Sequence, residues 1–78
     1  MKRNDIIKQL DNLEKDTELY IKEKQANKKL TKTRYQLVDD ITFILANLQI
    51  TSPNMQIDKK SFEYLRLMEI SDKIIRAR

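Results

Sequence analysis

The chain contains no cysteine, no histidine and no glycine, and Pro53 is its only proline. Without cysteine it forms no disulfide and offers no thiolate to a metal ion. Without histidine it lacks the usual zinc ligand and the usual general base near neutral pH. Without glycine it has no phosphate-cradling loop and no glycine hairpin. These absences predict a protein without a metal centre, a cofactor or a small-molecule substrate.

The remaining nucleophiles and carboxylates also argue against an enzyme. The serines at 52, 61 and 71 have no histidine to activate them. Asp39 and Asp40 are the only adjacent carboxylates, and neighbours on a helix diverge by about 100°, so the pair does not converge on one site. We therefore expect a non-catalytic protein.

Length and hydropathy predict one small domain. Seventy-eight residues allow a single domain, here 1–78. No apolar run approaches the roughly 18 residues of a membrane span. The N-terminal segment turns polar where a signal peptide needs an apolar run. With the missing cysteines, this predicts a cytoplasmic protein.

The stretch Thr33–Thr51 predicts the helix around which the rest is arranged. Six of its apolar residues share one arc about 120° wide at 100° per residue, which is the core stripe of an amphipathic helix. A thinner apolar line of Phe43, Ala46 and Ile50 follows the far side, with Asp39 at its head. This line has two interpretations: either one neighbouring helix packs on each side, or the line is a protein interface. The core stripe consists of Leu37, Val38, Ile41, Ile44, Leu45 and Leu48.

Two further helices flank this segment. A 3.6-residue period starts after Asn4, a candidate N-cap, and stops near Lys24, and Asn27 is a candidate helix end. After Pro53, Asp58 is a candidate N-cap, and the spacing of Ile57 and Phe62 is that of a hydrophobic staple. Short connections favour antiparallel neighbours. The prediction is an all-α antiparallel three-helix bundle with helices at about 4–26, 33–51 and 58–77.

The net charge of +4 is concentrated in the first half of the chain. Its densest part is Lys28, Lys29, Lys32 and Arg34. Such a cluster is either a solvated loop or a site for phosphates of nucleic acid or an anionic membrane surface. Nucleic acid is the less favoured partner, because the connection between the second and third helices is too long for a helix-turn-helix.

The C-terminal half resembles a known family of small helical proteins. The segment Leu37–Leu48 precedes a polar loop through Pro53, and Phe62-Glu-Tyr-Leu65 then leads to Ile70-Ser71. This spacing resembles that of immunity proteins of pediocin-like bacteriocins. The resemblance implies a cytoplasmic protein that protects a Gram-positive producer by engaging a membrane permease complex bound by the toxin. The high Lys, Ile and Asn usage equally suits a phage- or plasmid-borne accessory protein that inhibits a host protein by surface contact.

Three hypotheses about function follow. The first is a protein-binding module of inhibitor or immunity type that acts by helix-face contact. The second is a nucleic-acid binder that uses the basic segment 28–34. The third is a self-associating helical scaffold, with a homodimer as its simplest form. The candidate partner-binding residues are Phe43, Ala46, Ile50, Ile70, Lys28, Lys29, Lys32 and Arg34.

Overall fold

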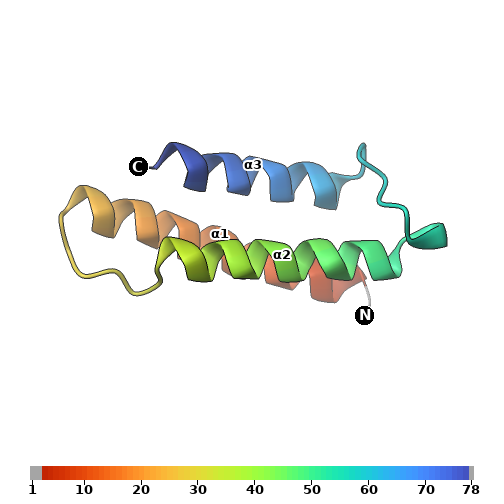
Figure 1. Ribbon diagram of the computed structural model, residues 1–78, viewed down its shortest axis with the longest axis horizontal. Coiled ribbons are helices and arrows are strands. Elements are labelled where there is room, and N and C mark those ends of the chain that lie inside the picture. Colours follow the sequence, from red (N-terminus) through yellow and green to blue (C-terminus); the bar gives the residue numbers. More distant parts are fainter. Residues whose placement is uncertain (1–2, 78) are drawn as a thin grey trace.

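The computed structural model describes residues 3–77, which form three packed helices (Figure 1). Helix α1 spans Arg3–Gln25, α2 spans Arg34–Thr51 and α3 spans Phe62–Arg76, with a short 3₁₀ turn, η1, at Pro53–Met55. Consecutive helices run in opposite directions, and the molecule measures 44 × 20 × 17 Å. The predicted all-α three-helix bundle is confirmed. None of the helices within 3–77 has the length and apolar character needed to cross a bilayer.

The core is a single apolar cluster to which all three helices contribute. Buried side chains recur every three or four residues on α1 and α3, and seven and then four residues apart on α2, as expected for one inward-facing stripe per helix. Thr17 is the polar member of the α1 stripe, and its hydroxyl donates to the Leu13 carbonyl at 2.7 Å, so the buried oxygen is satisfied within the helix. The apolar core residues are Ile6, Leu10, Leu13, Tyr20, Leu37, Ile44, Leu48, Leu67, Ile70 and Ile74.

Local hydrogen bonds explain where α1 ends and α2 begins. Asn27 has a φ of 57°, and the Lys28 amide donates to the Glu23 carbonyl at 2.8 Å, which is the Schellman arrangement of a helix C-terminus. Thr33 and Gln36 then form a reciprocal capping box with bonds of 2.8 and 3.3 Å. The helix end expected at Asn27 is confirmed. Thr31 and Thr33 are both able to cap the second helix by residue type, and Thr33 is the one that does.

The predicted start of α3 is wrong by about one turn. Asp58 does not cap the helix. Its carboxylate accepts from the Lys60 amide at 2.9 Å, which is an Asx turn. Ser61 is the N-cap and accepts from the Tyr64 amide at 3.3 Å. Phe62 is therefore the first helical residue and is exposed, so the expected staple with Ile57 is absent.

Candidate functional site

The apolar line on the far side of α2 faces solvent. Phe43 is 58% exposed and Ile50 is 65% exposed, and Ala46 between them is also exposed. The alternative in which a helix packs on each side of α2 is wrong for this line. In a three-helix bundle the helices stand at the corners of a triangle, so α1 and α3 cover the same arc of α2, around Leu37 and Ile44.

The solvent side of α2 carries unusually little charge. Of its 11 exposed residues only Arg34 and Asp39 are charged, whereas 7 of the 11 exposed residues of α1 are charged. A solvated helix face normally resembles that of α1. The outer face of α2 is thus markedly less charged than that of α1.

The basic segment is only partly available to a ligand. Lys28, Lys29 and Arg34 are exposed. The Lys32 ammonium, however, lies 2.8 Å from the Asp40 carboxylate and 2.9 Å from that of Asp16. The hydrogen bond to Asp40, followed by that to Asp16, raises the pKa of Lys32 above its ordinary value.

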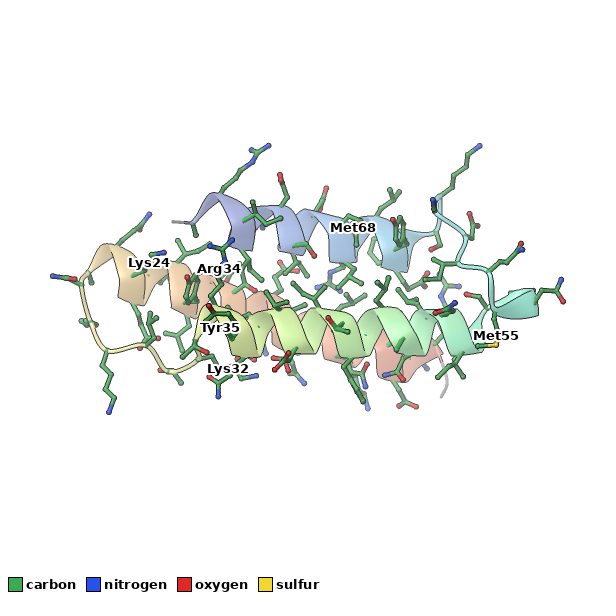
Figure 2. All side chains as sticks on the ribbon, viewed as in Figure 1. Lys24, Lys32, Arg34, Tyr35, Met55 and Met68 are labelled. Carbon is green, nitrogen blue, oxygen red and sulfur yellow. The ribbon has the colours of Figure 1, made fainter. Side chains whose placement is uncertain are left out.

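Lys32 therefore connects α1 to the start of α2. Figure 2 labels it near the start of α2, where Arg34 and Tyr35 also lie. The cluster predicted as four free cations consists of three exposed cations and one structural lysine, because the sequence pattern does not show which carboxylates fold onto the loop.

Ile70 is not a surface residue. It was predicted as a partner-binding candidate at the border of the charged side of its helix, but it is 2% exposed and belongs to the core cluster. Helix α3 turns Glu63, Leu67, Ile70 and Ile74 inward. Leu65 and Ile75, by contrast, face solvent.

Sequence reasoning also missed Tyr35 and Val38, which are exposed at the start of α2. Val38 was placed in the core stripe. The apolar arc of α2 is wider than the sector that two neighbouring helices cover, and this excess width was the sequence signal that some of its apolar residues face solvent.

Residues 3–77 contain no group of three carboxylates able to hold a metal ion.

Comparison with known proteins identifies no relative: no protein-family model, curated protein or solved structure matches the chain.

Proposed function

We propose that the chain is a non-catalytic protein-binding module, of inhibitor or immunity type, that acts through the outer face of α2. The observation that supports this most is the exposed line of Phe43, Ala46 and Ile50, with Asp39 as the charged residue at its head. The line lies on a helix whose start is capped and whose inner face is buried. Its side chains are thus presented with little loss of conformational freedom on binding.

The chemistry of the face indicates the kind of partner. An apolar helical line fits a hydrophobic groove, in the manner of other amphipathic helices that bind in grooves. The exposed cations Lys28, Lys29 and Arg34 precede this line in the chain, and the loop between α1 and α2 lies at one end of the molecule (Figure 1). A groove with an acidic rim would therefore be favoured, because opposite charges raise the association rate.

A single substitution tests this function. Phe43→Glu places a charge in the line without touching the core, so circular dichroism should show unchanged helicity. Capture of a partner from a lysate of the native host should weaken at least tenfold. Leu19→Glu is the matched control, since Leu19 is an exposed apolar residue of α1, and it should bind like the parent chain.

Two results would contradict the proposal. The first is equal binding by the parent chain and Phe43→Glu. The second is loss of the captured material on nuclease treatment, which would favour nucleic-acid binding through residues 28–34 instead.

A further inference from the structure

The charge of the molecule is divided unevenly along its long axis. Residues 22–36 and 73–77 carry eight cations and one carboxylate, whereas the rest of residues 3–77 carries six cations and eleven carboxylates. The net charges of the two parts are therefore +7 and −5. In Figure 1 the loop between α1 and α2, the start of α2 and the end of α3 lie at the same end of the molecule. We call the surface of residues 22–36 and 73–77 the basic end.

The fold brings the cations of distant segments together at the basic end. The Lys24 ammonium donates to the Ala77 carbonyl at 2.9 Å, which joins the last turn of α1 to the end of α3. Lys24, Lys73 and Arg76 line one hollow between these two helix ends. The basic end is thus a surface of the folded chain, and the sequence segment 28–34 is only one part of it.

Most cations of the basic end have no carboxylate partner. Glu23, the one carboxylate there, accepts from the amide and the hydroxyl of Thr31 at 3.0 and 2.9 Å. Lys32 and Arg76 form salt bridges with carboxylates outside the basic end. Five further cations are exposed and form no salt bridge within residues 3–77, namely Lys22, Lys28, Lys29, Arg34 and Lys73. Such a group of unpaired cations attracts anionic partners.

Two exposed side chains with apolar surface lie among these cations. Tyr35 follows Arg34 and is 84% exposed. Ile75 lies between Lys73 and Arg76 in the sequence and is 53% exposed. Tyrosine is enriched where a bilayer meets water, because its ring lies at the level of the lipid head groups. The basic end thus combines cations with apolar side chains, as surfaces that bind anionic membranes do.

We propose that the basic end binds the anionic head groups of a lipid bilayer, with the long axis of the molecule close to the membrane normal. Each cation near such a surface strengthens binding about fivefold. The attraction falls off within a Debye length of about 8 Å at physiological salt, and the molecule is 44 Å long. End-on binding therefore brings the cations to the lipid and keeps most of the acidic remainder of the chain beyond the range of repulsion.

Nucleic acid fits the basic end less well than a bilayer does. A DNA duplex is commonly read by a helix that lies in its major groove. Helix α2 or α3 in a groove would bring the exposed Asp39 or Asp72 close to the phosphates. Single strands are bound by stacking successive bases on aromatic side chains, and Tyr35 is the only aromatic residue within 22–36 and 73–77. A flat anionic surface contacts the end of the molecule alone.

Sedimentation with lipid vesicles measures this binding. The parent chain should bind vesicles that contain phosphatidylglycerol and should not bind vesicles of phosphatidylcholine alone. Binding should weaken as the salt concentration rises from about 0.1 to about 0.5 M, because salt screens the attraction. Inorganic phosphate added at constant ionic strength should not release the protein, since the proposed site is a surface of many head groups.

Two pairs of lysines show whether the basic end is responsible. Lys22→Gln combined with Lys73→Gln removes one cation from α1 and one from α3, and should lower the vesicle partition coefficient at least tenfold. Lys59→Gln combined with Lys60→Gln is the matched control. It removes the same charge from the connection between α2 and α3, at the other end of the molecule, and should lower the coefficient by less than about twofold. All four lysines are exposed, so helicity should be unchanged.

Tryptophan substitutions test the orientation, since the chain has no tryptophan of its own. The fluorescence of Tyr35→Trp should shift to shorter wavelength on anionic vesicles, because the ring enters the head-group region. Phe62→Trp, at an exposed position at the start of α3, should show no shift. Phe43→Glu should bind vesicles nearly as the parent chain does, which separates this proposal from protein binding by the outer line of α2.

Four results would overturn the proposal. The first is no binding to anionic vesicles at low salt, and the second is an equal loss of binding for the two lysine pairs. The third is release by inorganic phosphate, which would indicate a site for free phosphate. The fourth is tighter binding to RNA or duplex DNA than to vesicles at the same phosphate concentration, which would assign the basic end to nucleic acid.

Discussion

Two isoleucines of α3, five residues apart, have opposite roles. Ile70 is 2% exposed and belongs to the cluster shared by all three helices, whereas Ile75 faces solvent. An isoleucine on α3 thus packs in the core at position 70 and is exposed to solvent at position 75. The difference arises from a rotation of about 140° between the two positions.

This pair yields a prediction about stability. Ile70→Ala should lower the free energy of unfolding by about 2–5 kcal/mol, because it removes buried methyl groups and leaves a cavity. Ile75→Ala should change it by less than about 1 kcal/mol. Urea denaturation of both variants at low protein concentration measures the difference. Equal effects would mean that Ile70 is not a core residue.

At the scale of single elements, short-range hydrogen bonds decide the helix ends. Thr33 and Gln36 satisfy each other's backbone amides at the start of α2. Asn27 ends α1 in a left-handed conformation that asparagine tolerates better than most residues. The start of α3 is also decided by short-range hydrogen bonds. Asp58 accepts from the Lys60 amide in a local turn, and Ser61 accepts from the Tyr64 amide and caps the helix.

The cap of α2 gives a prediction at this scale. Thr33→Ala should lower the free energy of unfolding by about 1 kcal/mol, because a helix amide loses its acceptor. Thr42→Ala is the matched control: the Thr42 hydroxyl donates to the Val38 carbonyl within the helix, at 3.0 Å and exposed, and caps nothing. Thermal denaturation followed by circular dichroism compares the two. A loss for Thr42→Ala equal to that for Thr33→Ala would show that capping is not the cause.

At the scale of the whole molecule, salt bridges between charged side chains connect two of the three pairs of helices, α1 with α2 and α1 with α3. Lys32 is the clearest case, because it lies between Asp16 of α1 and Asp40 of α2. Arg66 has the same role between α3 and α1, where bonds to Glu14 and then Asp11 raise its pKa. Among residues 3–77, no salt bridge joins α2 to α3.

Lys32 gives a prediction of pH dependence. Its folded-state pKa is raised by Asp40 and Asp16, so its stabilising effect is present below about pH 10.4, the ordinary lysine pKa. The effect is lost as the pH rises through the folded-state value. Lys32→Met should cost no more than about 1 kcal/mol at neutral pH, since water screens these half-exposed groups.

The difference between the parent chain and Lys32→Met should disappear at strongly alkaline pH, as measured by urea denaturation. Lys29→Met, at an exposed loop position, should show no comparable pH-dependent difference. A constant difference for Lys32→Met across the whole range would assign the effect to packing of the lysine stem.

Local sequence patterns predict the three helices and most of their ends, because those depend on interactions between residues at most five apart. The 3.6-residue period, the Thr33 cap, the end at Asn27 and the stop before Pro53 are all of this kind. The start of α3 was missed because Asp58 and Ser61, three residues apart, are both residue types that cap helices. The outer line of α2 was also recognised from periodicity, although its exposure was left open between two interpretations.

Which apolar residues face water depends on how the three helices pack together. Each helix of a triangular bundle is covered over one sector alone, so the rotation of the helix divides a wide apolar arc into core and surface. That rotation buries Ile70, exposes Val38 and Phe43, and brings Lys32 to Asp16. It depends on how all three stripes pack at once, and no local pattern contains it.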